Sequence, residues 1–402
     1  MRGLKLFLVS ASTLLLSIAA SAKKYPASNN DDDADFLKEI TFGDTLSAPY
    51  KALRAQVHAL NLQAVKKGFN GTVLIGYKGK LLYEKSFGYA DRSASILNTP
   101  VIPTQVASIS KTFTAMAIMW LVDHKKVDIK NSVQTYLPSF PYENITVEML
   151  LSHRSGLQEY MDFAEVYYAN KSVPMSNQDV LDILANKKLK LNFTPDTKFK
   201  YCNTNYVLLA MIIEKTSEKP FREFLQEKFF TPLNMKNTFI FDPSQTPTQT
   251  YAKGYKSNLT LYEPNYQDGV VGDKGVYTTA EDLYRWDQAL YSNKLISKNS
   301  KEIAYYPHSP LTSDLENYGL GWRMNVYPNL EKMVYHTGLW HGYQGILSRH
   351  IKDNFTVIIL SNRYIEGVVK KNSQTLYKLA VPYLGLTDYD GTLVATAKET
   401  DS

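Results

Sequence analysis

Segments with the pattern of β-strands lie at both ends of the chain, and a long stretch with helical patterns separates them. Two strand-like segments, 71–77 and 80–88, come early and are joined by a short turn at Lys78-Gly79. The others come after residue 317, at 318–326, 332–336, 343–350 and 355–360. This distribution predicts one antiparallel sheet that is assembled from the two ends of the chain and flanked by helices.

The stretch between these strands predicts a mainly helical lobe that is inserted into the sheet-forming part. One segment there, 112–122, is apolar on every side, which is typical of a buried helix. Helices are expected at 112–122, 147–151, 178–184, 206–215, 221–229 and 279–290, and beside the strands at 47–67 and 368–384. A capping-box pattern, Thr278-x-x-Glu281 or Thr279-x-x-Asp282, precedes the helix at 279–290. The expected fold class is therefore α/β (α+β).

One domain is expected over 40–386, with a site in the crevice between its two lobes. The sheet lobe is placed at about 45–107 and 275–386, and the helical lobe at about 108–274. A polar, patternless linker at 23–39 precedes this domain, and a tail at 387–402 follows it.

The first 22 residues have the pattern of a secretory signal peptide. Arg2 and Lys5 supply the positive start, an apolar stretch follows, and Ala20-Ser21-Ala22 is a cleavage site of small residues. The apolar stretch is short for a membrane span and is interrupted by serines, so cleavage is favoured over anchoring. We therefore expect a periplasmic or secreted protein, cleaved near Ala22, with no stable membrane span.

Composition excludes several function classes. The net charge of +6, or about +4 without Arg2 and Lys5, is too mild and too dispersed to indicate a nucleic-acid partner. The single cysteine, Cys202, excludes an internal disulfide. No pair of His or Cys residues has the spacing of metal ligands, so no metal or cofactor is expected. The sequence leaves the oligomeric state open.

The pattern Ser108-Ile109-Ser110-Lys111 opens the apolar helix and suggests nucleophilic catalysis. A serine hydroxyl needs a base within hydrogen-bond reach to become a good nucleophile. Residues three apart lie on the same face of a helix, so Lys111 can contact Ser108. Burial of this helix would desolvate the amine and favour its neutral, basic form. By itself this short pattern is weak evidence, because it also occurs at Ser21 to Lys24.

Two further motifs strengthen the interpretation. Tyr201-Cys202-Asn203 follows a proline-containing loop and precedes the apolar helix at 206–215. His336-Thr337-Gly338 lies at the end of the strand expected at 332–336. With these three boxes the chain resembles the serine beta-lactamase and penicillin-binding-protein superfamily. The similarity is greatest to the branch of class C beta-lactamases, D-alanyl-D-alanine carboxypeptidases and related esterases, and it extends from about residue 70 to residue 362.

The resemblance implies a role for each residue of the three boxes. Ser108 would be acylated, Lys111 would be its base, and Tyr201 would pass a proton to the leaving group. Asn203 would orient the lysine and the substrate amide. His336 and Thr337 would hold the leaving-group side. Gly338 belongs to the same box, and the backbone N–H groups of Ser108 and Leu339 would form the oxyanion hole.

Other similarities to the superfamily look architectural, and some positions depart from it. The segment 150–157, which contains His153 and Arg154, and the segment 318–322 are interpreted as structural. His336 replaces the lysine of class C beta-lactamases, and the stretch 339–342, with large side chains at 339–341, replaces a smaller glycine-rich stretch. Cys202 is interpreted as a small buried substitute for serine, not as a reactive thiol.

The predicted function is hydrolysis of an amide, ester or beta-lactam bond through an acyl-enzyme on Ser108. His336 favours a D-amino-acid peptide or ester, as a small molecule or peptide, over a beta-lactam. The alternatives are a true class C-type beta-lactamase and a non-catalytic protein that binds penicillin or muropeptides. A generic α/β-hydrolase is excluded because the chain has no Gly-x-Ser-x-Gly motif.

Overall fold

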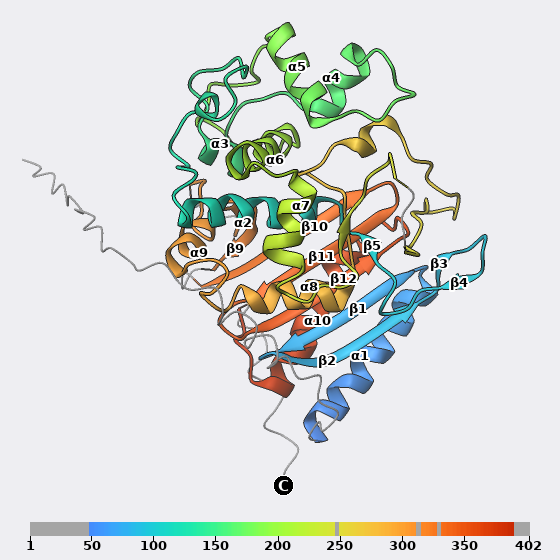
Figure 1. The fold of residues 1–402 in the computed structure, drawn as a ribbon. Helices are drawn as coiled ribbons and strands as arrows, with labels where there is room; N and C mark the ends of the chain where they lie inside the picture. The colour runs from blue at the N-terminus through green and yellow to red at the C-terminus, as the bar shows by residue number, and fades with distance from the viewer. Residues whose placement is uncertain (1–47, 246–248, 311–314, 328–330, 390–402) are drawn as a thin grey trace, which may run out of the picture.

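The computed structural model describes residues 48–389 except 246–248, 311–314 and 328–330. The predicted signal peptide, the linker at 23–39 and residues 390–402 of the tail lie outside the described residues. Strands from both ends of the chain lie side by side in the centre of Figure 1, with helices on both faces. The predicted fold class is confirmed.

The central sheet has seven antiparallel strands in the order β2-β1-β12-β11-β10-β9-β8. The strands are β1 (Gly71–Tyr77), β2 (Lys80–Phe87), β8 (Glu316–Tyr318), β9 (Arg323–Val326), β10 (Lys332–Trp340), β11 (Tyr343–His350) and β12 (Phe355–Ser361). β1 pairs with β12 along its whole length, from Gly71 opposite Ser361 to Tyr77 opposite Phe355. This pairing joins the two ends of the chain into one sheet.

Helices cover both faces of the sheet because side chains alternate along its strands. On β1, Val73 and Ile75 face α1 (Ala48–Lys66) and α10 (Val368–Leu384), whereas Leu74 faces the opposite side. That opposite side carries α8 (Ala280–Ala289) and the helical lobe (Figure 1). Each face of the sheet therefore has its own apolar core.

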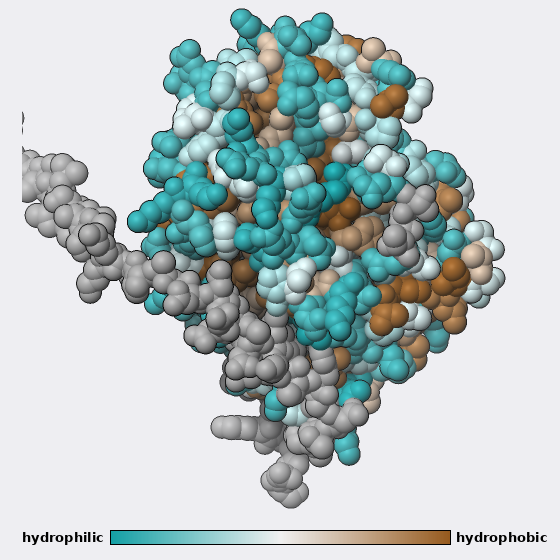
Figure 2. Space-filling view, in the orientation of Figure 1, coloured by the Kyte–Doolittle hydropathy of each residue, from teal (hydrophilic) through white to brown (hydrophobic). Residues whose placement is uncertain are grey.

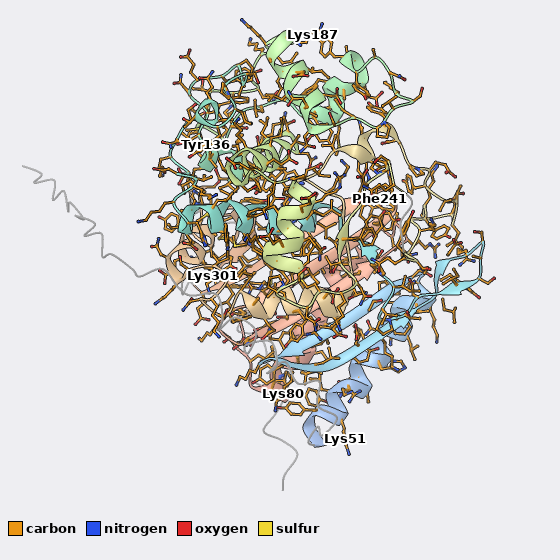
Figure 3. All side chains as sticks on the ribbon, viewed as in Figure 1. Lys51, Lys80, Tyr136, Lys187, Phe241 and Lys301 are labelled. Atoms are coloured by element: carbon orange, nitrogen blue, oxygen red, sulfur yellow. The ribbon has the colours of Figure 1, made fainter. Side chains whose placement is uncertain are left out.

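The helical lobe is built around α2 (Ser110–Asp123), which packs against α6 (Thr204–Ser217). All residues of α2 from Ser110 to Met119 are buried, which explains why this helix is apolar on every side. The remaining helices are α3 (Val147–Leu151), α4 (Tyr160–Tyr167), α5 (Asn177–Lys187), α7 (Phe221–Leu225) and α9 (Lys298–Ala304). Side chains fill the space between these helices and the sheet, and the labelled Lys187 and Lys51 mark opposite ends of the molecule (Figure 3).

Several boundaries differ from the prediction. The segment expected as one strand at 318–326 forms β8 and β9, because Gly321 adopts a positive φ of 81° and turns the chain against α2. The strand expected at 332–336 continues as β10 to Trp340, so His336 lies inside the strand and not at its end. The helix expected at 221–229 ends at Leu225 and continues as a π-helical turn, Gln226–Phe230.

Some short elements had no clear pattern in the sequence. These are α4, α9 and the short strands β3 (Tyr89–Asp91), β4 (Ile96–Leu97), β5 (Thr104–Gln105), β6 (Phe239–Ile240) and β7 (Val276–Thr278).

At the start of α8, Thr279 caps the helix by accepting a hydrogen bond from the Asp282 N–H. The Asp282 carboxylate accepts from Asn237 and Thr238.

None of the helices in the described part of the chain combines the length and apolar character that crossing a bilayer requires. The face of the molecule in Figure 2 is largely hydrophilic over the helical lobe.

Glu84 on β2 predicts a pH dependence of stability. Burial, together with the negative charges of Glu281 and Asp282, raises the pKa of Glu84 to about 7. The folded state therefore binds more protons than the unfolded state between about pH 4.5 and pH 7, so the free energy of unfolding falls as pH rises through this window. Glu84→Gln should be more stable than wild type by about 2 kcal/mol at pH 8, and this difference should shrink toward pH 5. Denaturant titrations at both pH values measure it.

The control is Glu302→Gln on the exposed surface of α9. It should change the free energy of unfolding by less than about 0.5 kcal/mol at either pH. Equal stability of Glu84→Gln and wild type at pH 8 would contradict the prediction.

Candidate active site

Ser108 lies in a strained turn directly before α2. It is the middle residue of a 3-10 turn, Ala107–Ile109, in which both of its neighbours are buried while Ser108 keeps partial exposure. Ala107 has a positive φ of 48°, which a residue with a side chain rarely adopts. Strain of this kind costs about 1–3 kcal/mol and is common at functional sites. The turn presents the Ser108 side chain to a pocket of about 390 Å³.

Lys111 is fully buried and is held by three oxygen atoms. Its Nζ lies 3.1 Å from Ser108 Oγ, 2.7 Å from Asn203 Oδ1 and 2.8 Å from the carbonyl oxygen of Asp273. The amide and carbonyl oxygens can only accept, so each takes one N–H of the amine. The remaining position on Nζ faces Ser108 Oγ. In the neutral amine this position is a lone pair, which is the geometry of a general base.

Tyr201 lines the pocket together with Ser108. Its ring centroid lies 5.0 Å from Lys111 Nζ and 4.2 Å from the centroid of the His153 ring. Within the described residues, the buried Tyr201 hydroxyl has no hydrogen-bond partner. A buried hydroxyl without a partner is uncommon and requires an explanation, such as a bound group or water.

Glu159 holds Asn203 in one orientation. The Oε2 atom of Glu159 accepts the Asn203 N–H at 2.9 Å and the Asn203 Nδ2–H at 3.0 Å. Because Nδ2 faces this carboxylate, Oδ1 of Asn203 must face Lys111. Burial raises the pKa of Glu159 above its ordinary value. Sequence reasoning missed Glu159, and the only available signal was its position just after the segment 150–157.

The third box lies on an open edge of β10. β9 pairs only with Lys332–Tyr335 of β10, so within the described residues the same edge has no strand partner from His336 to Trp340. Thr337, Gly338 and Leu339 line the pocket beside Ser108. An open strand edge can bind an extended substrate through backbone hydrogen bonds.

Gly338 allows this edge to approach the Ser108 turn. A Cβ atom at this position would lie 2.1 Å from the carbonyl oxygen of Val106 and 3.2 Å from Cβ of Ala107. The Ser108 N–H lies at the start of its turn, where the turn itself does not use the donor. The predicted oxyanion donors therefore lie on two segments that are in direct contact.

His336 does not line the pocket with the other predicted residues. It is fully buried, its Nε2 lies 3.1 Å from the Tyr318 hydroxyl, and its Nδ1 lies 2.7 Å from the carbonyl oxygen of Thr337. Burial, followed by the nearby charges of Arg323 and Lys111, lowers the pKa of His336 well below its ordinary value. The structure thus brings seven of the eight predicted residues to the pocket or to Ser108. The buried His336 imidazole does not line the pocket, and its ring centroid lies 6.2 Å from that of Tyr201.

Two basic residues that the sequence did not single out also line the pocket. Arg323 on β9 lies with its Cζ 5.0 Å from the centroid of the Tyr201 ring. Its buried Nε has no hydrogen-bond partner among the described residues. Lys370 on α10 forms an ion pair with Glu316. This end of the pocket is therefore suited to an anionic group.

The thiol of Cys202 is buried beside the site, and burial raises its pKa to about 12. A thiol in this state is a poor nucleophile at neutral pH. In the part of the chain that the structure describes, no group of three or more His, Cys, Asp or Glu side chains is arranged to hold a metal ion.

Replacing Glu159 tests its hold on Asn203. Glu159→Gln keeps an oxygen acceptor but loses the negative charge, so Asn203 should be held more weakly against Lys111. We expect the rate of Ser108 acylation to fall by about tenfold. Glu165→Gln, an exposed change on α4, is the control and should leave the rate unchanged. An acylation rate of Glu159→Gln equal to wild type would show that the charge has no role.

Comparison with known proteins places this geometry in a family. The family model described as Beta-lactamase matches residues 57–380. Penicillin-binding protein 4* of Bacillus subtilis is 35% identical over 331 residues, which cover 78% of this chain and 73% of the relative. A putative penicillin-binding protein of the same organism, PbpX, is 29% identical over 319 residues, with coverage of 78% and 75%.

Solved structures share the fold. A penicillin-binding protein from Bacillus halodurans has a TM-score of 0.70 at 23% identity, covering 80% of this chain and 98% of that protein. The D-amino acid amidase from Ochrobactrum anthropi SV3, complexed with D-phenylalanine, has a TM-score of 0.66 at 20% identity, covering 83% and 99%. The chain belongs to the beta-lactamase family, within the superfamily of serine beta-lactamases and penicillin-binding proteins.

Proposed function

We propose that the protein is a serine hydrolase that cleaves amide or ester bonds through an acyl-enzyme on Ser108. The observation that carries the proposal is the environment of Lys111 Nζ, in which two fixed acceptors leave one position facing Ser108 Oγ. The partial exposure of Ser108 and the open edge of β10 beside it support the same conclusion.

In the proposed acylation step, neutral Lys111 takes the proton of Ser108 Oγ while this oxygen bonds to the substrate carbonyl carbon. The N–H groups of Ser108 and Leu339 stabilise the resulting oxyanion. The Tyr201 hydroxyl passes a proton to the leaving nitrogen or oxygen, and the bond from the carbonyl carbon to that atom breaks. Water then attacks the ester on Ser108, with the same groups acting in reverse.

The basic end of the pocket supports a substrate with a carboxylate on its leaving-group side. Tyr201 donates the proton to the leaving group in this mechanism, and Arg323 lies against the Tyr201 ring. Thr337 adds a hydroxyl donor at the same pocket. We therefore rank a D-amino-acid peptide or ester first, as for a carboxypeptidase-like member.

A class C-type beta-lactamase is the second candidate, because a beta-lactam also presents a carbonyl and a carboxylate. Relatives at 35% and 29% identity carry penicillin-binding names. A kinetic panel separates the candidates by kcat/KM on a chromogenic cephalosporin, D-alanyl-D-alanine peptides, D-amino-acid amides and short aryl esters. Highest turnover of the cephalosporin would overturn our ranking.

Covalent labelling tests the acyl-enzyme itself. A fluorescent penicillin or fluorophosphonate should label wild type and leave Ser108→Ala unlabelled. Saturable binding of penicillin without covalent labelling of wild type would favour the non-catalytic binding protein.

Export to the periplasm or the medium is part of the proposal, with cleavage near Ala22. The pattern of residues 1–22 supports it. Mass spectrometry of the exported protein should give an N-terminus at Lys23, and an intact Met1 would contradict it.

A further inference from the structure

The segments 150–157 and 318–322, which have no role in the proposed chemistry, come together with the third box inside the protein. His153 comes from the segment 150–157, Tyr318 ends β8, and His336 lies on β10. Their side chains are buried, with 0%, 2% and 0% of each residue exposed. The Tyr318 hydroxyl lies 3.1 Å from Nε2 of His153 and 3.1 Å from Nε2 of His336. One phenol thus links two imidazoles.

The hydrogen-bond partners fix where each proton lies. Nδ1 of His153 accepts the Cys202 N–H at 3.1 Å, so it carries no proton. Burial, followed by the charge of Lys111 and the neighbouring groups His336 and Arg323, lowers the pKa of His153 well below its ordinary value. His153 is therefore neutral, with its proton on Nε2, where it donates to the Tyr318 oxygen.

The positions of the protons on Tyr318 and His336 can be assigned in the same way. The Thr337 carbonyl oxygen can only accept, so Nε2 of neutral His336 is unprotonated and accepts the hydroxyl proton of Tyr318. Burial raises the pKa of Tyr318 well above its ordinary value, so the hydroxyl stays protonated. Neutral His336 then carries its proton on Nδ1 and donates it to the carbonyl oxygen of Thr337 at 2.7 Å. Every donor in this chain has one acceptor.

His153 and His336, at the two ends of this series of hydrogen bonds, each contact the backbone of a segment that lines the pocket. At one end, His153 binds the backbone next to Tyr201 and packs against its ring, with the centroids 4.2 Å apart. At the other end, His336 binds the backbone of Thr337, two residues before the predicted oxyanion donor Leu339. This series of hydrogen bonds therefore connects the helical lobe to β10 through three side chains that do not line the pocket of Ser108.

We propose that Tyr318 is a positioning residue that sets the distance between Tyr201 and the oxyanion strand by joining His153 to His336. The proposal rests on the function proposed above. It assigns His336 a role through its contacts with Tyr318 and the Thr337 backbone, in place of direct contact with the leaving group. It also gives a reason for histidine at this position, because the imidazole accepts from Tyr318 at Nε2 and donates to the Thr337 carbonyl at Nδ1, whereas a lysine ammonium cannot accept.

Tyr318→Phe tests the proposal, because it keeps the ring and removes only the hydroxyl. We expect kcat on the best substrate of the panel to fall by about 10- to 100-fold, as for a misplacement on the order of 1 Å. KM should stay within about twofold, because the pocket lining is unchanged. A kcat equal to wild type would overturn the proposal.

Tyr284→Phe on α8 is the matched control. It also removes one buried tyrosine hydroxyl, which donates to the Lys80 carbonyl at 3.3 Å on the opposite part of the sheet. Both variants should lose similar thermal stability, but Tyr284→Phe should keep the wild-type kcat. An equal loss of kcat in both variants would show that Tyr318 has only a structural role.

The histidine tautomers give a readout that does not depend on catalysis. Long-range proton–nitrogen NMR of protein labelled with 15N-histidine should show His153 protonated on Nε2 and His336 on Nδ1, both neutral at pH 6. His153→Gln and His336→Gln assign the signals. Opposite tautomers or a charged imidazole at pH 6 would overturn the proposal.

The two readouts also separate this proposal from the proposed function. If wild type hydrolyses none of the panel, the proposed function fails and the positioning role fails with it, whatever the tautomers are. If wild type is active and Tyr318→Phe is equally active, only the positioning role fails.

Discussion

Lys111→Met should reduce the rate of Ser108 acylation by about 10³-fold, because it removes the base and keeps a side chain of similar length. KM should change little, since Lys111 faces Ser108, Asn203 and Asp273 and does not line the pocket. Stopped-flow acylation with a chromogenic ester or cephalosporin measures the rate. An acylation rate above a tenth of the wild-type value would exclude Lys111 as the base.

The matched control is Lys301→Met on α9. Lys301 is also buried, and its amine donates to two oxygen acceptors, the backbone carbonyls of Leu290 and Ser292. Burial lowers the pKa of Lys301 to about 8, so this control also removes a buried amine with a perturbed pKa, at a place away from Ser108. We expect Lys301→Met to lose stability and to keep the wild-type acylation rate per folded molecule.

Chemical rescue separates a base from a fixed positive charge. Lys111→Ala leaves a space beside Ser108 that a small amine can enter. Methylamine should restore part of the acylation rate, and the restored rate should rise with pH as the neutral amine becomes more abundant. Rescue by ammonium salts that is independent of pH would instead indicate a purely electrostatic role.

The first box could be found in the sequence because its chemistry depends on local spacing, whereas the second and third boxes were identified through their resemblance to the superfamily. Ser108 and Lys111 are one helical turn apart. The apolar residues on every side of α2 indicated that this helix is buried. The pairing of β1 with β12 also followed from strand patterns at both ends of the chain. Such features are properties of short segments, which periodicity and spacing record directly.

The remaining features depend on contacts between distant segments. Glu159 can orient Asn203 only because α4 begins beside that residue. Arg323 can line the pocket only because β9 stops pairing with β10 at Tyr335. The side-chain direction of His336 could not be derived either. In a strand, successive side chains alternate between faces, and the sequence does not say which face of β10 meets the pocket.

Gly338→Ala should reduce kcat/KM by about 10²-fold, although it adds only one methyl group. The new Cβ would lie 2.1 Å from the Val106 carbonyl oxygen, a backbone atom that cannot rotate away. To reach an ordinary contact, β10 must move by about 1 Å from the turn that carries Ser108. A displacement of this size in the site costs about two orders of magnitude in rate. Steady-state kinetics on the panel substrates measures it.

Two comparisons show whether this effect belongs to the site. Gly385→Ala, at the end of α10, has a positive φ of 61° and nothing within 4 Å of the new Cβ, so it tests a glycine change without a collision. It should lower stability by about 1 kcal/mol and leave kcat/KM unchanged. In Gly338→Ala, the acylation rate should fall by a larger factor than the affinity for a non-reactive product. The reason is that the contact of the new Cβ with Val106 separates the two oxyanion donors and does not close the pocket. If Gly338→Ala acylates like wild type, the edge of β10 does not carry an oxyanion donor, and the proposed arrangement of Ser108 and Leu339 is wrong.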